Sequence, residues 1–189
     1  MPSPNDGTER THSMRSIARA LLSLLLVLCL TLSAVGCDGG NVRDDLTVEN
    51  IRFAITPAVE KDSAWVAVDS DFISASTWGE DYEELLSMTA EYVICIAANA
   101  DMNINEMGIF RFDSASDANR AKKIVDNYLA ATALRMTPLL ESYNQAELPK
   151  LDNADVTVLG NYLLYTILDS STTTVVHSAF EETLTETAS

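Results

Sequence analysis

The chain has 189 residues, of which 47% are hydrophobic and 21% are charged. This composition is typical of a globular protein, and it excludes a collagen-like or disordered chain. The formal net charge of −16 excludes binding to nucleic acid through surface charge, because the phosphates would repel an acidic protein.

The first 36 residues are predicted to be a signal peptide. Arg15 and Arg19 supply its positive charge, and an uncharged, leucine-rich stretch of 17 residues follows from Ala20 to Gly36. Residues 1–13 are polar, so we expect translation to start at Met14, which begins a leader of ordinary length.

Cys37 is the predicted site of lipidation. Ala34-Val35-Gly36-Cys37 resembles a bacterial lipobox, although Ala34 stands where leucine is commonest. In that chemistry the sulfur takes a diacylglyceryl group, and two acyl chains anchor a protein stably where one would be marginal. Two alternatives remain. An ordinary signal peptidase could cleave after the small residues, or the apolar stretch could stay as an uncleaved anchor near the minimum length for crossing a bilayer.

These features divide the chain into residues 1–36 as a signal peptide, residues 37–45 as a lipidated cysteine with a flexible acidic spacer, and residues 46–189 as one globular domain. Without its leader the chain keeps 153 residues, with 9 basic and 26 acidic side chains. A domain of this size can form a core without metal ions or disulfide bonds. Once Cys37 is modified, Cys95 is the remaining cysteine, so no internal disulfide is expected.

The first part of the predicted domain has weak patterns. Residues 46–59 show no clear apolar period, so a short helix and a strand fit equally well, and residues 64–68 are a short apolar run. Residues 80–88 are predicted to be a short helix, because their acidic start suits the positive end of the helix dipole. Residues 92–98 and 106–112 are predicted to be the two strands of a β-hairpin.

A long helix follows the first hairpin. Ser114 or Ser116 is expected to cap it, and Thr132 is the one polar residue on its apolar face. Pro138 lacks a backbone donor, so the helix should kink or end nearby. The apolar face is formed by Ala118, Ala121, Val125, Tyr128, Leu129, Met136 and Leu139.

The last part of the chain contains the clearest hairpin. Residues 144–152 are predicted to be a polar loop, and residues 155–159 and 162–168 are strands joined by Gly160-Asn161, which suits a tight turn with positive φ. Ser170 or Ser171 is expected to cap a final helix. The order of elements predicts an α+β fold: an antiparallel sheet of about four strands, made of two β-hairpins, with the long helix and the C-terminal helix packed on one face.

Several of these segments carry a resemblance to a known family. Asn105-Glu106-Met107-Gly108-Ile109-Phe110, the long helix, residues 148–154 and Gly160-Asn161-Tyr162-Leu163-Leu164 are similar to the domain-of-unknown-function family 4358. This is a family of small lipoproteins of Gram-positive bacteria. The similarity covers roughly residues 92–184, about half of the chain, and Met107 stands where isoleucine is more usual. The family has no assigned activity, so the resemblance implies a lipoprotein and supplies no catalytic residues.

Two motifs suggest a metal site, and neither is complete. Asp101-x-Asn103-x-Asn105 begins like a calcium loop, but Glu106 stands where glycine is needed and Phe112 where the bidentate glutamate is needed. An asparagine-rich turn explains the segment better. His177 has no other histidine or cysteine at ligand spacing, and we expect it on the solvated side of the last helix. We therefore predict no metal and no cofactor.

The remaining candidates are also interpreted as structural. Cys95 lies in an apolar strand and is expected in the core. The acidic run of Glu80, Asp81, Glu83 and Glu84 could hold paired catalytic carboxylates, but a solvated helix face is the simpler interpretation. The basic cluster of Arg120, Lys122 and Lys123 is likewise expected on a solvated face. Trp65, Trp78 and Tyr82 are core or rim aromatics, or the lining of a ligand groove.

Three functions follow as hypotheses. The first is a non-enzymatic binding or interaction module at the outer face of the cell membrane, anchored through the lipid on Cys37 and facing an envelope protein partner. The second is an extracytoplasmic hydrolase that uses carboxylates of residues 80–84. The sequence shows no nucleophile paired with a general base, which weakens this hypothesis. The third is a lipoprotein that binds a small ligand and passes it to a transporter. We favour the first and predict no enzymatic activity.

Overall fold

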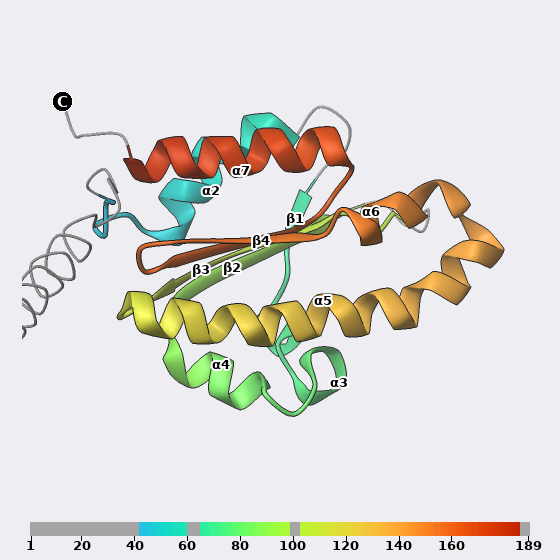
Figure 1. Ribbon diagram of the computed structural model, residues 1–189, viewed down its shortest axis with the longest axis horizontal. Coiled ribbons are helices and arrows are strands. Elements are labelled where there is room, and N and C mark those ends of the chain that lie inside the picture. The colour runs from blue at the N-terminus through green and yellow to red at the C-terminus, as the bar shows by residue number, and fades with distance from the viewer. Residues whose placement is uncertain (1–41, 60–64, 99–102, 186–189) are drawn as a thin grey trace, which may run out of the picture. The chain divides into compact units, whose positions relative to one another are not determined.

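The computed structural model describes residues 42–59, 65–98 and 103–185 (Figure 1). Their centre is an antiparallel sheet of five strands in the order β1-β2-β3-β5-β4. The strands are β1 (Trp65–Ala67), β2 (Thr89–Ala97), β3 (Glu106–Phe112), β4 (Asp155–Leu159) and β5 (Tyr162–Ile167). The predicted α+β class and both β-hairpins are confirmed, and the strand count is five because the apolar run at residues 65–67 adds an edge strand.

Helices cover both faces of the sheet, which corrects the prediction of a single covered face (Figure 1). The long helix α5 lies on one face with α3 and α4, whereas α2 and the C-terminal α7 lie on the other. The helices are α2 (Val48–Val59), η1 (Ser70–Phe72), α3 (Ala75–Trp78), α4 (Tyr82–Met88), α5 (Ala115–Tyr143), η2 (Gln145–Glu147), α6 (Leu148–Asp152) and α7 (Ser170–Thr185). The physical reason is that every residue of β5 is buried, so each face of the sheet has apolar side chains to cover.

Each face of the sheet therefore has its own core. On the α5 face, Phe110 and Phe112 of β3 pack with Leu163 and Tyr165 of β5 and with Trp78. On the α7 face, alternate residues of the same strands pack against the apolar sides of α2 and α7. The α7 core includes Ile51, Ile55, Val93, Cys95, Met107, Ile109, Tyr162, Leu164, Val176 and Phe180.

Two glycines are required by the sheet itself. Gly160 has a φ of +59° in the turn between β4 and β5, as the Gly-Asn pattern predicts. Gly108 lies directly opposite Tyr165 across β3 and β5, and a Cβ at that position would overlap the Tyr165 ring. The absent side chain thus gives the tyrosine ring its place on the α5 face of the sheet.

The long helix begins as expected and ends later than Pro138 suggests. The Ser114 hydroxyl caps it by accepting a hydrogen bond from the Asp117 backbone at 3.1 Å. The helix continues through Pro138 to Tyr143, and its ribbon turns in this last part (Figure 1). The predicted apolar face of the helix is buried or half-buried as far as Met136. Beyond the proline Leu140 is buried instead of Leu139, which is 43% exposed.

Three local predictions are corrected. Residues 144–152 form η2 and α6 instead of a loop, because Pro149 stands in the first turn of α6, where a helix tolerates proline. Residues 80–81 precede α4, which begins at Tyr82. The cap of α7 is Asp169 and neither serine: its Oδ1 accepts from the backbone N–H groups of Ser171 and Thr172 at 3.1 and 3.0 Å. The undecided segment of residues 46–59 contains helix α2.

Residues 42–45, which fall within the predicted spacer, contact the folded domain. Val42 packs against the α7 core, and the Arg43 backbone N–H donates to the Leu184 carbonyl at 2.9 Å. The Tyr162 hydroxyl also donates to the Leu46 carbonyl at 2.7 Å. The leader, Cys37 and the rest of the spacer lie outside the described residues. Within the described ranges, no helix has the length and apolar character needed to span a bilayer.

Candidate ligand-binding site

Glu106 is a buried carboxyl group at one end of the sheet. It is the first residue of β3, lies opposite Ile96 of β2 and Ile167 of β5, and is 8% exposed. The alternation of a strand places its side chain on the same face as Gly108 and Phe110, so it points toward α5. A carboxyl group in an apolar setting is stable only with hydrogen-bond partners.

Two tyrosines supply those partners. The Tyr128 hydroxyl of α5 donates to Glu106 Oε1 at 2.7 Å, and the Tyr165 hydroxyl of β5 donates to the same oxygen at 2.5 Å. Both lone pairs of Oε1 are then occupied, so any further hydrogen bond of this carboxyl group must be made by Oε2. No residue in the described part of the chain donates to Oε2.

The environment favours the neutral form of Glu106. Burial raises the pKa of this carboxyl group, while the hydrogen bonds from Tyr165 and Tyr128 and the charge of Arg135 act against that rise. Burial and the neighbouring Glu106 raise the pKa of both tyrosines, so each hydroxyl keeps its proton and remains a donor. The arrangement holds a carboxyl group whose second oxygen can carry a proton.

A cavity of about 260 Å³ lies beside Glu106, between the end of the sheet and the second half of α5. Its apolar wall comes from Phe72, Ile96, Ile104, Met136 and Ile167. Glu106, Asn105, Thr132 and Arg135 are polar residues that line it. Pockets for small ligands have this combination of an apolar wall with a few placed polar groups.

Arg135 is an exposed cation in the wall of this cavity. Its guanidinium donates to the Thr132 hydroxyl at 3.2 Å, and no carboxylate of the described chain forms an ion pair with it. The Asn105 side chain also lines the cavity, and its Oδ1 is buried without a hydrogen-bond partner among these residues. Unused polar groups beside a cavity are what a ligand site requires.

An aromatic cluster holds the buried end of the site in place. Trp78 of α3 stacks on Tyr128, with ring centroids 3.9 Å apart and an interplanar angle of 7°. It also contacts Tyr165 edge to face at 5.8 Å. Such ring contacts restrict the tyrosines and therefore fix the direction of their hydroxyl groups. Of the predicted aromatics, Trp78 is thus a core residue that supports the site, whereas Trp65 and Tyr82 are half-buried elsewhere.

His177 is buried, which contradicts the expectation of a solvated side chain. It is 8% exposed on the α7 face of the sheet. Its Nδ1 lies 2.7 Å from the Thr157 hydroxyl, and its Nε2 lies 3.0 Å from the Thr166 hydroxyl. Burial lowers the pKa of His177, although Asp155 and Glu181 oppose that shift. The ring therefore serves as a neutral hydrogen-bond link between α7 and the last two strands.

The other single candidates have structural surroundings. Cys95 is 2% exposed in the α7 core, as predicted, and burial raises the pKa of its thiol. Asp101 lies outside the described residues, and Asn103 Oδ1 accepts a hydrogen bond from the Asn105 backbone, as in an asparagine turn. The parts of the chain that the structure describes contain no group of three or more histidine, cysteine or acidic side chains able to hold a metal ion.

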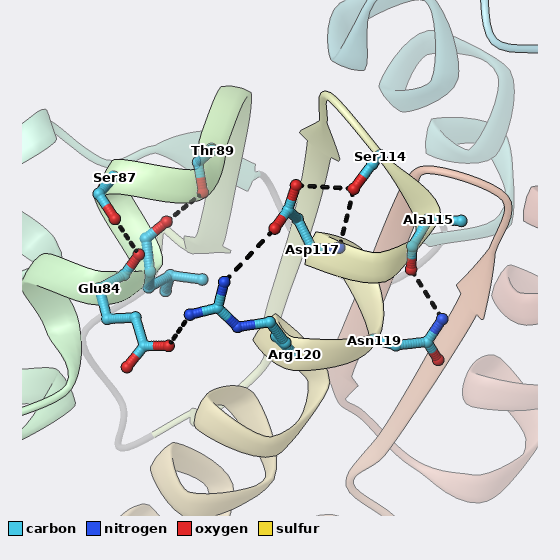
Figure 2. Close-up of polar contacts among 9 residues, drawn as sticks. Glu84, Ser87, Thr89, Ser114, Ala115, Asp117, Asn119 and Arg120 are labelled. Carbon is cyan, nitrogen blue, oxygen red and sulfur yellow. Dashed lines mark hydrogen bonds and ion pairs between the residues drawn. The ribbon is translucent and has the colours of Figure 1, made fainter.

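The acidic run and the basic cluster meet between α4 and α5. Figure 2 shows the Arg120 guanidinium between Glu84 Oε1 at 2.6 Å and Asp117 Oδ1 at 3.6 Å. Lys122 pairs with Asp126 one turn further along α5. Glu80, Asp81 and Glu83 are exposed, as expected of a solvated face. The structure therefore gives Glu84 an ion-pair partner, and Asp81 and Glu84 also line a hollow of about 480 Å³ together with Arg120 and Lys123.

Sequence reasoning missed Glu106, although a signal for it exists. Glu106, Gly108, Phe110 and Phe112 share one face of a strand by simple alternation. A glutamate on the same face as two phenylalanines indicates a buried carboxyl. Its tyrosine partners come from a helix and a strand 22 and 59 residues away, so the cluster itself is a product of the fold.

Comparisons with known proteins give no match: no family model, no curated protein and no solved structure is similar to this chain. The resemblance to the domain-of-unknown-function family 4358 therefore stays a prediction.

Proposed function

We propose that this protein is a non-enzymatic binding module, anchored by a lipid on Cys37 at the outer face of the cell membrane, that holds a small ligand in the Glu106 cavity. The cavity is the observation that carries the binding role. It combines an apolar wall with a buried carboxyl and with a guanidinium that has no acidic partner among the described residues. The lipid anchor rests on the lipobox-like sequence before Cys37.

The cavity supports binding better than hydrolysis. Glu106 is the one carboxyl group among the described residues that line it, and these residues include no histidine, cysteine or lysine. Hydrolysis by carboxylates needs two of them in different environments, and nucleophilic hydrolysis needs a nucleophile beside a base. The polar groups of this cavity can orient a ligand, but they do not form either pair.

The anchor is tested by labelling growing cells with radioactive palmitate. The native chain should take up the label, the Cys37→Ser variant should not, and the Cys95→Ser variant should take it up like the native chain. Cys95→Ser is the matched control because Cys95 is a core residue. Absence of label from the native chain, or its persistence in Cys37→Ser, would contradict the anchor.

The binding role is tested by equilibrium dialysis of the full protein against small molecules extracted from the cell envelope, with mass spectrometry of what is retained. We expect a compound retained unchanged by the native protein and by Leu139→Trp, but lost from Met136→Trp. Met136 lines the cavity, whereas Leu139 is exposed one turn further along α5. Conversion of the compound by a trace amount of protein would favour the hydrolase, and no retention would contradict the binding role.

A further inference from the structure

We propose that the Glu106 cavity selects a small monocarboxylate with an apolar tail, whose carboxylate lies between Glu106 Oε2 and the Arg135 guanidinium. This inference rests on the proposed binding function and adds the chemical class of the ligand. It follows from three features of the cavity: the groups at its polar end, its size and the charges around it.

Two groups at the polar end of the cavity, Glu106 and Arg135, offer donors, while Asn105 Oδ1 is an acceptor. The Tyr128 and Tyr165 hydroxyls both donate to Glu106 Oε1, which leaves Oε2 as the carboxyl oxygen without a partner from the described residues. A neutral Glu106 would donate its proton from Oε2, because Oε1 is already fully used as an acceptor. Arg135 adds a cation in the same wall, and its guanidinium forms no ion pair with the described residues. An anion that accepts from both groups complements this pair.

The size of the cavity limits the ligand. At ~30 Å³ for each water-sized volume, a cavity of about 260 Å³ holds about nine such volumes. This is enough for a ligand of about eight non-hydrogen atoms and lies below the range of a drug-sized pocket. The apolar residues Phe72, Ile96, Met136 and Ile167 would cover the tail of such a ligand.

The surrounding charges disfavour a cationic ligand. Arg135 on α5 is the described charge that acts on the Glu106 carboxyl. Glu147 and Lys150 form a separate pair, in which Lys150 Nζ lies 2.7 Å from Glu147 Oε2. Glu147 Oε2 also accepts a hydrogen bond from the Ile104 backbone N–H at 3.0 Å, so this carboxylate already has a cation and a backbone donor as partners. Arg135 is then the one cation in the described wall without an acidic partner, and it would repel an ammonium group.

The test uses three probes of equal chain length: hexanoate, hexylammonium and hexanol. Each is titrated calorimetrically into the full protein in detergent, with detergent alone as the blank. The range runs from about pH 6 to about pH 9, above the ordinary carboxyl pKa of ~4.3, so that hexanoate stays ionised. We expect hexanoate to bind at least about tenfold more tightly than either other probe, as charge-assisted hydrogen bonds allow.

Two variants separate the roles of the polar groups. Arg135→Gln should weaken hexanoate binding roughly tenfold or more, and Arg120→Gln on the same helix should leave it unchanged. Glu106→Gln should keep most of the affinity, because its amide can still accept from the tyrosines and donate toward the cavity. Loss of the Glu106 proton should weaken hexanoate binding, so any fall in native affinity with rising pH should be absent from Glu106→Gln.

Preference for hexylammonium, with binding lost in Glu106→Gln, would overturn the carboxylate class and leave the binding function standing. Binding of none of the three probes, together with a compound retained in the dialysis experiment, would also overturn the ligand class alone. Equal affinity of native protein and Arg135→Gln for hexanoate would contradict the proposed position of the carboxylate. The dialysis experiment tests the proposed function separately: if the protein retains no compound there, the binding function itself is wrong.

Discussion

At the residue scale, Glu106 is a carboxyl group whose charge is disfavoured by its burial. An ionised carboxylate in this position would lose most of its hydration, and two tyrosine hydroxyls replace only part of that hydration. The neutral acid suits the site better. The pKa of Glu106 in the folded chain is therefore raised above its value in the unfolded chain.

This shift predicts how stability depends on pH. A raised folded-state pKa means that the full stability is present below the unfolded pKa of about 4.5 and is lost as the pH rises through the folded value. Glu106→Gln should not show this loss, so the variant should become more stable relative to the native chain as the pH rises. Urea unfolding at a series of pH values measures the difference. Glu141→Gln, on the exposed surface of α5, is the control, and a native advantage that grows with pH would contradict the assignment.

For His177 we expect the opposite dependence of stability on pH. Its lowered folded-state pKa means that its contribution is complete above the unfolded value of 6.5 and is lost as the pH falls toward the folded value. His177→Leu should remove this acid-side loss. It should also lower the free energy of unfolding by about 2 to 3 kcal/mol at neutral pH, because the Thr157 and Thr166 hydroxyls lose their partner. Unchanged stability of the variant at neutral pH would show that these hydrogen bonds contribute little.

The two residues show where sequence reasoning reaches its limit at this scale. Cys95 was placed correctly because its neighbours in the chain are apolar. His177 and Glu106 depend on partners that come from other elements, so their burial could not be read from neighbours alone. Val176 and His177 are both buried on α7, because this helix lies over the sheet edge and turns two adjacent positions inward.

At the scale of single elements, the cap of α7 is the clearest correction with a measurable consequence. Asp169 accepts from two backbone N–H groups and from the Ser171 and Thr172 hydroxyls, and these bonds lower its pKa to about 2. Asp169→Ala should lower the free energy of unfolding by about 1 kcal/mol, as loss of a helix cap does. Ser170→Ala should have an effect within ~0.5 kcal/mol, as is usual for an exposed site. If Ser170→Ala lowered the free energy of unfolding more than Asp169→Ala does, Ser170 and not Asp169 would be the cap.

Gly108 gives a second prediction for an element. A methyl group at this position of β3 would overlap the Tyr165 ring directly across the strand pair. Gly108→Ala should therefore lower the free energy of unfolding by about 2 kcal/mol or more, since the ring must move within a packed core. It should also shift the tyrosine resonance of Tyr165, because the hydrogen bond to Glu106 would be displaced. A variant as stable as the native chain would show that the ring has room to move.

Elements were predicted well where periodicity is strong. Both hairpins and the long helix follow from alternation, turn residues and a serine cap. The prediction of a single covered face misses the second layer, although the strand at residues 162–167 is apolar except for Thr166 and is buried along its whole length. A continuous apolar strand is the signal for burial on both faces.

At the scale of the whole molecule, the described residues form two apolar layers on either side of one sheet (Figure 1). The α7 layer is closed by α2 and α7, whereas α5 continues past the end of the sheet on the other side. The Glu106 cavity lies there, between the sheet end and the second half of α5. A ligand in this position would not have to open either core.

The location of the site is tested most directly by nuclear magnetic resonance of the full protein with labelled isoleucine methyl groups, during addition of hexanoate. Ile96, Ile104 and Ile167 line the Glu106 cavity, whereas Ile51 and Ile55 lie in the α7 core. The largest shifts should appear at the first three methyl groups, with Ile51 and Ile55 unchanged. Shifts confined to Ile51 and Ile55, or no shifts at saturating hexanoate, would contradict a ligand site at Glu106.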